Sequence, residues 1–342
     1  MTYILPIKAA TANRSAELAG YLRWLAQRAE TIVVDGSPAH IFAEHAAAWG
    51  MHVRHTAPHA DLATPMGKVG GVLTGVRLAS HERLIIADDD VRYDDVSMAQ
   101  LACALDNYDV VRPQNYFEPL PWHARVDTGR MLLNRATGGD WPGTLGVRRA
   151  VLRATGGYDG SVMFENLELV RTVLAAGGNE QVLLGAYVLR HPSSTQHFWS
   201  QRVRQAYDEM ARPGRLAVQL AVIPAIMHLI RKSRWQLLAA GIASIAAVAE
   251  FGRRRAGGAA VFPVSSSLLA PVWFAERAVC SWLALGAHFT LGGIPYRGAV
   301  LCQAATPIPV LEARHSGSYH RLQLHSNPSD RKPRRKPRHL SV

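Results

Sequence analysis

The sequence predicts an α/β fold with a mostly parallel sheet, followed by a hydrophobic helical region. Two observations lead to this prediction. Strand-like and helix-like stretches alternate over residues 1–115, and uncharged runs follow one another after residue 215. The chain has 342 residues, 48% of them hydrophobic, which suffices for one large domain and an appended part. The formal net charge of +12 indicates an anionic partner.

Short apolar stretches alternate with helical patterns in the first third of the chain. We expect strands at residues 3–7, 31–34, 51–54, 84–87 and 109–112, and helices at residues 16–29 and 69–79. Asp35 follows the second strand, and Asp88, Asp89 and Asp90 follow the fourth. Ligands usually bind where parallel strands end, so both acidic segments are expected at the same edge of the sheet.

The start of the chain reads as a buried strand rather than a signal peptide. No basic region precedes residues 2–7, and no small-residue cleavage site follows a long apolar run. Cys103, Cys280 and Cys302 are far apart, which supports neither a disulfide framework nor a zinc knuckle. We therefore expect this N-terminal part of the chain to face a reducing cytoplasm.

Four runs without charged residues follow: 216–230, 235–249, 256–275 and 278–296. A membrane-spanning helix needs about 20 apolar residues, and the first two runs are shorter. Buried helices of a soluble domain are the alternative, but the succession of runs beside Arg and Trp favours membrane attachment. A span at 216–230 would place the basic residues 231–234 outside, so an interfacial helix is expected there. The later pair of runs would then cross and return.

These features divide the chain into three regions. Residues 1–212 are predicted to form an α/β domain, residues 213–300 an interfacial or transmembrane region, and residues 301–342 a disordered basic tail. Six basic residues lie between positions 331 and 338, with prolines among them. Attraction of this tail to anionic lipids and a plain solvated tail both remain open.

The acidic triplet at residues 88–90 is the most informative short segment. A divalent cation that bridges a diphosphate prefers hard oxygen ligands, usually one or two carboxylates. Asp88 and Asp90 follow a buried strand and are spaced so that both side chains can reach the sheet edge. An acidic surface turn is the alternative, but the strand before the triplet and the matching Asp35 turn favour a site.

Six segments in order resemble the inverting family 2 glycosyltransferases. They are VVDGS (33–37), GKVGGVLTG (67–75), ADDDVRY (87–93), GTLGVRRAVLRATGGYDG (143–160), ENLEL (165–169) and QRVRQ (201–205). The chain is most similar to membrane-bound members of this family, including ceramide glucosyltransferase-like enzymes. The segment GGIPYRG (292–298) resembles the membrane-associated tail of these enzymes. The resemblance implies a GT-A fold, a nucleotide-sugar donor such as a UDP-sugar, and Mg²⁺ or Mn²⁺. It also implies a lipid or saccharide acceptor at a bacterial-type inner membrane.

The resemblance assigns donor and metal roles to matching positions. Asp35 would contact the base or ribose, and Lys68 would lie near the nucleotide or diphosphate. Asp88 and Asp90 would bind the metal, with Asp88 and Asp89 also on the donor side.

Further roles fall on the second half of the domain. Gln201 and Arg204 match the family's QxxRW motif, and Arg204 would pair with the diphosphate through its planar fork. Gly143 and Thr144, with the neighbouring Trp141, would border the acceptor.

Two positions depart from the family pattern. The family's catalytic Asp is replaced by Asn166, which cannot act as a general base. Glu165 is therefore the expected base, with Asp140 as the fallback. A helix N-terminal carboxylate is the alternative role of Glu165. The motif's Trp is replaced by Gln205, which weakens an expectation of processive synthesis. We expect a single transfer, because the uncharged runs do not predict several long spanning helices that would form a polysaccharide channel.

Other classes of protein fit less well. A sugar nucleotidyltransferase would need a Gly-rich loop after the first strand, where this chain has KAATANRS. A nucleic-acid-binding protein would explain the charge, but no helix-turn-helix, zinc finger or RNP-like motif occurs. A non-catalytic membrane-associated protein that binds a nucleotide sugar remains an alternative.

Overall fold

The computed structural model describes residues 1–9, 11 and 15–316. Its strands are β1 (Thr2–Ile7), β2 (Glu30–Asp35), β3 (Arg54–Thr56), β4 (Arg83–Ala87), β5 (Val91–Arg92), β6 (Val110–Phe117), β7 (Thr144–Arg148), β8 (Glu180–Arg190), β9 (Ile294–Tyr296) and β10 (Ala299–Leu301). Its α-helices are α1 (Ser15–Ala26), α2 (Ala39–Trp49), α3 (Gly67–Leu78), α4 (Asp95–Ala104), α5 (Trp122–Thr137), α6 (Arg149–Thr155), α7 (Glu165–Ala175), α8 (Thr195–Tyr207), α9 (Pro213–Arg231), α10 (Trp235–Arg254), α11 (Val264–Leu291) and α12 (Ile308–His315). Three short 3₁₀ helices are η1 (Ala60–Leu62), η2 (Asp208–Ala211) and η3 (Arg255–Ala260).

The main sheet has eight strands in the order β3-β2-β1-β4-β7-β6-β8-β5. Only β7 and β5 run antiparallel to their neighbours. The prediction of an α/β fold with a mostly parallel sheet, followed by apolar helices, is confirmed. The chain moves outward from β1 to β3 and then returns to place β4 on the other side of β1. This reversal opens a crevice at the carboxyl ends of β1 and β4, the usual ligand site of such sheets.

Helix α3 lies unusually close to β1 because glycines face the strand. A Cβ at Gly75 would lie 2.3 Å from Ile4 Cγ2, and a Cβ at Gly71 would lie 3.0 Å from Pro6 Cβ. The close approach fixes the amino end of α3, with Lys68, beside the ends of β1 and β2.

Most strand predictions overlap the observed strands, but the third was wrong. Residues 51–54 were expected to pair, whereas β3 begins only at Arg54. The backbone amides of His52 and Val53 both donate to Trp49 O, so these residues form the turn that ends α2. The strand predicted at 109–112 is longer than expected and continues to Phe117.

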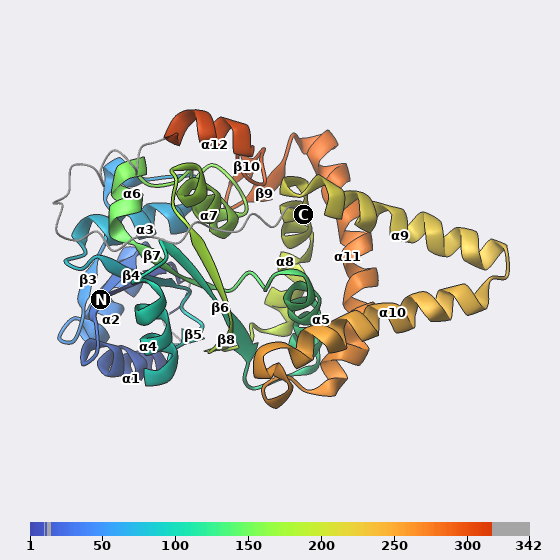
Figure 1. Ribbon diagram of the computed structural model, residues 1–342. Coiled ribbons are helices and arrows are strands. Elements are labelled where there is room, and N and C mark those ends of the chain that lie inside the picture. Colours follow the sequence, from blue (N-terminus) through green and yellow to red (C-terminus); the bar gives the residue numbers. More distant parts are fainter. Residues whose placement is uncertain (10, 12–14, 317–342) are drawn as a thin grey trace.

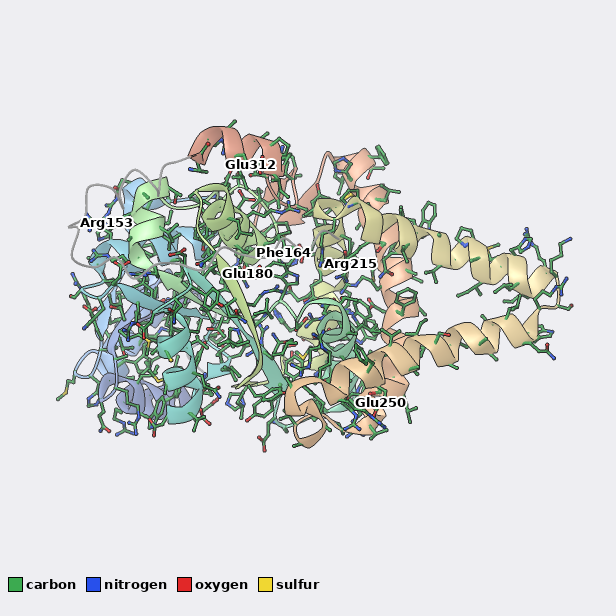
Figure 2. The ribbon with its side chains drawn as sticks, in the orientation of Figure 1. Arg153, Phe164, Glu180, Arg215, Glu250 and Glu312 are labelled. Carbon is green, nitrogen blue, oxygen red and sulfur yellow. The ribbon has the colours of Figure 1, made fainter. Side chains whose placement is uncertain are left out.

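Three C-terminal helical segments are long and apolar enough to cross a membrane. Figure 1 shows α9 and α10 projecting together from the body of the molecule, and Figure 2 shows their side chains pointing outward. The apolar window of α9 is 6% buried and that of the α10 segment 11% buried, against 39% for α11. Helix α11 packs along α5 and α8 as well as α9 and α10.

The two runs predicted at 256–275 and 278–296 do not form two separate helices. A single helix, α11, extends from Val264 to Leu291, and Glu276 and Arg277 lie in its middle. Glu276 accepts hydrogen bonds from Arg202 of α8 at 3.0 and 2.5 Å, so this charge faces α8 and does not end the helix. These two runs were predicted to cross the membrane and return, but the chain does not turn between them at Glu276.

The segment after α11 returns to the α/β part of the molecule. Strands β9 and β10 form a hairpin, Gln303 bridges Val162, and α12 packs against α7. The buried Glu168 of α7 accepts a hydrogen bond from the Thr306 amide at 2.7 Å. Residues 301–316, which were expected in a disordered tail, are therefore structured, and the tail's remaining residues 317–342 lie outside the described residues.

Candidate active site

Three elements bring opposite charges together at the crevice. Lys68, at the start of α3, places its Nζ 2.6 Å from Asp88 Oδ1 and 2.7 Å from Glu165 Oε1. Asp88 follows β4, and Glu165 is the first residue of α7. Burial disfavours the Lys68 ammonium, but the two carboxylates outweigh this and raise its pKa. The predicted base and the first Asp of the acidic triplet are therefore joined through Lys68.

Arg190, the last residue of β8, completes the cluster from the opposite side. Its Nε lies 2.9 Å from Asp90 Oδ2, and its Nη2 lies 3.2 Å from Asp88 Oδ2. Burial opposes ionisation of Asp88, but Lys68 and Arg190 outweigh it and lower its pKa. The sequence analysis missed Arg190, whose only signal is a basic residue at the end of an apolar stretch.

The acidic triplet has the donor atoms that a divalent cation needs. Asp90 Oδ1 is buried and has no hydrogen-bond partner among the described residues. An orphaned buried carboxylate oxygen is costly, and a cation would relieve that cost. The carboxylates of Asp88 and Asp90 are hard oxygen ligands of the kind Mg²⁺ and Mn²⁺ prefer, so the site fits such an ion.

A pocket of about 340 Å³ adjoins the acidic triplet. It is lined by the ends of β1 and β2, the start of α3, Asp89 and the β9–β10 hairpin, through these residues: Pro6, Ile7, Lys8, Val34, Gly36, Pro58, Ala63, Thr64, Gly67, Lys68, Gly70, Gly71, Asp89, Tyr296 and Arg297. Lys8, Lys68 and Arg297 give it a basic wall that suits a phosphate-bearing ligand. Tyr296 and Arg297 were not predicted as site residues.

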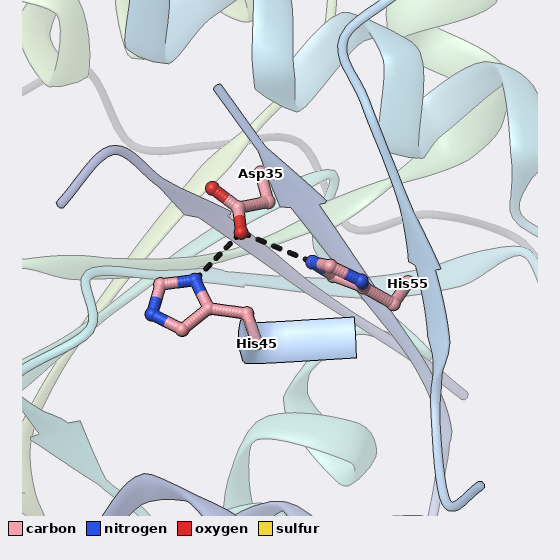
Figure 3. A group of neighbouring side chains, drawn as sticks. All are labelled: Asp35, His45 and His55. Carbon is pink, nitrogen blue, oxygen red and sulfur yellow. Dashed lines mark hydrogen bonds and ion pairs between the residues drawn. The ribbon is translucent and has the colours of Figure 1, made fainter. Parts of the chain in front are cut away.

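Asp35 lies beneath this pocket in a buried cluster with two histidines (Figure 3). Its Oδ2 accepts hydrogen bonds from His45 Nδ1 at 2.7 Å and His55 Nε2 at 3.0 Å, and its Oδ1 accepts from the Ser37 amide at 2.9 Å. Burial opposes ionisation of Asp35, but these hydrogen bonds outweigh it and lower its pKa.

The same three side chains could in principle hold a metal ion, since their ligand atoms lie within 4.8 Å of one another. Ligand atoms around a shared tetrahedral ion such as Zn²⁺ are about 3.3 Å apart, given metal–ligand distances of about 2.0 Å. The shorter separations in this cluster, 2.7 and 3.0 Å, fit direct hydrogen bonds better. We therefore interpret the cluster as an anchor that fixes the end of β2, and the predicted nucleotide contact of Asp35 stays a prediction.

The loop before β7 holds the three predicted acceptor residues in different surroundings. Gly143 O accepts from the Asp88 amide at 2.8 Å, which joins the loop to the acidic triplet. The Thr144 hydroxyl is buried and donates to Ile86 O at 2.8 Å, so it supports the sheet. Trp141 is partly exposed and packs against Phe164, with the Arg112 guanidinium over its ring. Of the three, Trp141 has the side chain that an acceptor can reach.

The two candidate bases occupy different positions. Glu165 belongs to the charged cluster through Lys68. Asp140 is buried, and its Oδ1 accepts from Arg130 at 2.6 Å and from Asn134 at 2.8 Å, both on α5. Asn166 donates to Pro142 O at 3.0 Å and so connects α7 to the Gly143 loop. The geometry favours Glu165 over Asp140.

Asp208 is a further carboxyl group that the sequence analysis missed. It begins η2, and its Oδ1 is buried without a hydrogen-bond partner among the described residues. Burial first, and the neighbouring Glu165 second, raise its pKa.

The QRVRQ segment lies on α8 between the pocket and α11. The Arg204 guanidinium lies 5.3 Å from the centroid of the Tyr296 ring, which lines the pocket, and Gln201 Nε2 lies 3.1 Å from His197 Nε2. Gln205 Oε1 accepts from Arg202 Nη1 at 2.9 Å. Arg204 therefore borders the pocket through Tyr296, and neither Gln201 nor Arg204 is among the lining residues.

The fold and the site together define an α/β protein with a crevice that combines carboxylates, a basic pocket and a candidate base. No protein-family model matches the chain, and no curated protein sequence matches it. The solved structures similar to this chain include a mannosyltransferase, PcManGT, from Pyrobaculum calidifontis in complex with GDP-Man and Mn²⁺. The identity is 17% and the TM-score 0.47, with 82% of this chain and 86% of that chain covered.

Two further neighbours cover less of this chain. One is TarS 1-349 of S. aureus in complex with UDP-GlcNAc, with 14% identity, a TM-score of 0.41 and coverage of 58% of this chain and 60% of that one. The other is glucosyl-3-phosphoglycerate synthase of Mycobacterium tuberculosis in complex with Mn²⁺, UDP and phosphoglyceric acid. There the identity is 16%, the TM-score 0.41 and the coverage 60% of this chain and 75% of that one. At such identities the resemblance concerns the fold, and what each neighbour binds is a property of that protein.

Proposed function

We propose that the chain is an inverting, family 2-like glycosyltransferase with a GT-A catalytic domain. It would move a sugar from a nucleotide-diphosphate donor, preferably a UDP-sugar, to a lipid or saccharide acceptor at the membrane. One observation carries this proposal: the acidic triplet, the basic pocket and the carboxylate of Glu165 meet at one crevice of the sheet.

The donor is assigned to the pocket between β1, β2 and α3. Its volume of about 340 Å³ and its lining by Lys8, Lys68 and Arg297 suit a nucleoside with its phosphates. The start of α3 adds backbone N–H groups and the positive end of the helix dipole, which favour phosphate. Asp35 would hold the end of β2, which forms the wall of the base or ribose site. Arg204 packs against the Tyr296 ring and would hold that ring at the edge of the diphosphate site.

A divalent cation, Mg²⁺ or Mn²⁺, would be held by Asp88 and Asp90. When bound, such an ion stabilises the negative charge of the departing diphosphate. Asp89, which lines the pocket, is placed on the donor side of the triplet.

Glu165 is proposed as the general base. As the acceptor oxygen forms its bond to the anomeric carbon, the hydroxyl proton passes to the Glu165 carboxylate, and the bond from that carbon to the diphosphate breaks. A single displacement of this kind inverts the anomeric configuration. Lys68 holds Glu165 through the 2.7 Å contact and balances its charge before the acceptor enters.

The acceptor is proposed to approach from the side of the loop at residues 141–144. Trp141 offers an aromatic face, and the Gly143 backbone borders the triplet. The apolar helices α9–α11 would keep this side at the membrane surface, with the domain of residues 1–212 facing the cytoplasm of a bacterial-type cell. Residues 213–300 would then provide the membrane region, and the basic tail would add attraction to anionic lipid.

Calorimetry on the detergent-purified protein tests the donor assignment. We expect UDP and UDP-sugars to bind in the presence of Mn²⁺ and to bind at least about tenfold more weakly to Asp90→Ala, since a charge-assisted contact contributes about 1.5–3 kcal/mol. Asp61→Ala is the matched control, because Asp61 is exposed and pairs with Arg77 away from the triplet. Absence of UDP binding with any divalent cation, in folded protein, would refute the UDP-donor assignment.

A further inference from the structure

Arg190 occupies the carboxylates that the acidic triplet would offer to a cation. Its Nε and Nη2 bind Asp90 Oδ2 and Asp88 Oδ2 at 2.9 and 3.2 Å. Asp88 Oδ1 is taken by Lys68 at 2.6 Å. Of the four oxygens of these two carboxylates, the one without a partner among the described residues is Asp90 Oδ1.

Gly143 provides the space in which the Arg190 guanidinium lies. A Cβ at position 143 would lie 2.7 Å from Asp88 Oδ2 and 2.9 Å from both Cζ and Nη1 of Arg190. Any side chain there would displace either the guanidinium or the carboxylate. The contact between Arg190 and Asp88 therefore depends on a backbone position without a side chain.

The charges show why Arg190 and a divalent cation compete. Lys68 and Arg190 face the carboxylates of Asp88, Asp90 and Glu165, so the cluster carries one net negative charge. A divalent cation added alone would reverse that sign and would repel the guanidinium at close range. A diphosphate that enters with the cation restores the balance and offers Arg190 a second pair of oxygens, which suit its planar fork.

We infer that Arg190 is an exchangeable counter-cation of the donor site, an inference that rests on the proposed function. Without donor, Arg190 holds Asp88 and Asp90 and weakens the binding of a divalent cation alone. With donor, Arg190 releases both carboxylates and binds the diphosphate. Donor and cation therefore bind cooperatively, and each raises the affinity for the other by the same factor.

The test measures Mn²⁺ and UDP binding separately in the full-length protein and in Arg190→Ala. We expect Arg190→Ala to bind Mn²⁺ alone about tenfold more tightly, because the competing cation is gone. We expect it to bind UDP in the presence of Mn²⁺ about tenfold more weakly, because a charge-assisted contact to phosphate is lost. Free Mn²⁺ is read by its electron paramagnetic resonance signal and UDP binding by calorimetry.

Three variants make the result specific. Arg92→Ala removes a nearby arginine that binds Asp89 O and Glu17 but neither carboxylate of the pair, and it is expected to change neither affinity. Arg190→Lys keeps the charge but loses the fork, so it should exclude Mn²⁺ yet bind UDP poorly. The double variant Arg190→Ala with Asp90→Ala should lose the gain in Mn²⁺ affinity, which assigns the bound ion to the triplet and not to the Asp35 cluster.

Opposite changes in the two affinities support the inference. An unchanged or lower Mn²⁺ affinity in folded Arg190→Ala would overturn it, and so would a gain in Mn²⁺ affinity without any loss of UDP affinity. If the wild-type protein bound no UDP, the proposed donor would be wrong. GDP would then replace UDP as the probe, while the Mn²⁺ measurement alone would still decide whether Arg190 competes for the carboxylates.

Discussion

At the residue scale, Asn166 and Gln205 depart from the motifs of the family 2 glycosyltransferases that the sequence resembles, and both have partners that the usual Asp and Trp could not bind. Asn166 donates to Pro142 O, whereas an Asp carboxylate has no proton to donate. Gln205 accepts a hydrogen bond from Arg202, whereas a Trp side chain only donates. Both replacements therefore belong to the local packing of this chain.

Replacing Asn166 by the family's Asp tests this interpretation. Asn166→Asp turns a donor into an acceptor that faces Pro142 O, so we expect a loss of about 1–3 kcal/mol in unfolding free energy and no gain in transfer activity. Chemical unfolding and a transfer assay provide the two measurements. A more active Asn166→Asp variant would show that the base belongs at position 166.

Removing the carboxylate of Glu165 tests its role as base. Glu165→Gln keeps the size of the side chain but cannot accept the proton, so kcat should fall by about 10²–10⁴-fold. Asp140→Asn is the comparison. Because Asp140 is held by Arg130 and Asn134, we expect that variant to lose stability more than kcat. Full activity in Glu165→Gln with none in folded Asp140→Asn would move the base to Asp140.

At the element scale, the position of α3 against β1 decides where Lys68 lies. The glycine-rich segment GKVGGVLTG owes part of its composition to packing, since a Cβ at Gly75 would approach Ile4 within 2.3 Å. Sequence patterns predicted this helix and most of the first strands, because their apolar residues follow regular spacing. Strands β7 and β8 were not predicted, because their pairing joins segments far apart in sequence.

The same difference between local and distant contacts applies to the candidate site. Asp88, Asp90, Lys68 and Glu165 were identified because they lie in short recognisable segments. Arg190 reaches the site from β8 and belongs to no segment whose spacing marks it as functional. Arg297 lies in the segment GGIPYRG, which was assigned to the membrane-associated tail and not to the site. Thr144 was predicted to border the acceptor. Its hydroxyl donates to Ile86 O, a contact between distant segments that the sequence pattern does not reveal.

Adding a methyl group at Gly75 tests the packing of α3. Gly75→Ala should lower the unfolding free energy by about 1–3 kcal/mol, since Ile4 or the helix must shift. Gly20→Ala is the matched control in α1. Among the described residues, no atom lies within 4 Å of a Cβ at Gly20, so the higher helix propensity of Ala should stabilise the protein by up to about 1 kcal/mol. Equal effects of the two substitutions on unfolding would contradict the close packing.

Glu30 joins β2 to the loop before β4 and gives stability a pH dependence. Burial opposes its ionisation, but hydrogen bonds from Thr2, Ser80 and His81 outweigh it and lower its pKa from 4.5 to about 2. Because the pKa is lowered in the folded state, the stabilisation is complete above about pH 4.5 and is lost as the pH falls towards about 2.

The variant Glu30→Gln measures this contribution. It should be less stable than the wild type by about 1 kcal/mol at pH 7, because a charge-assisted hydrogen-bond network is weakened. Urea unfolding at several pH values should show the difference shrinking below pH 4.5. A difference that grows as the pH falls would contradict the lowered pKa.

At the scale of the whole molecule, the α/β part of the chain and the apolar helices are packed against each other. Helices α9 and α10 project from the body (Figure 1), while α11 packs on α5 and α8, and the following hairpin lines the pocket. Near the base of α10, Glu250 binds Arg253 and Arg254 (Figure 2), so charges gather where the projection meets the domain. This arrangement suits a domain held at a membrane by a projecting helical pair.

Substitutions on α10 test the membrane role. Leu237 and Ile242 are 57% and 50% exposed, and replacing both by Asp should abolish flotation with phosphatidylglycerol-containing vesicles. The physical reason is the cost of about 2.5–3.5 kcal/mol for each carboxylate placed in the apolar layer. Met51→Asp is the control, because Met51 is 93% exposed and lies outside the three apolar helices, just after the end of α2. Equal flotation of both variants would contradict a membrane role for α10.

The most direct test of the central claim is sugar transfer itself. Purified protein is incubated with UDP-sugars, Mn²⁺ and a membrane lipid extract, and the lipids are analysed by mass spectrometry beside the Glu165→Gln variant. We predict a lipid whose mass increases by one sugar residue, with release of UDP, in the wild type and at least about 10²-fold less of it in the variant. Wild-type protein that binds donor yet yields no glycosylated lipid or saccharide from any UDP- or GDP-sugar would contradict a transferase and favour a nucleotide-sugar-binding protein.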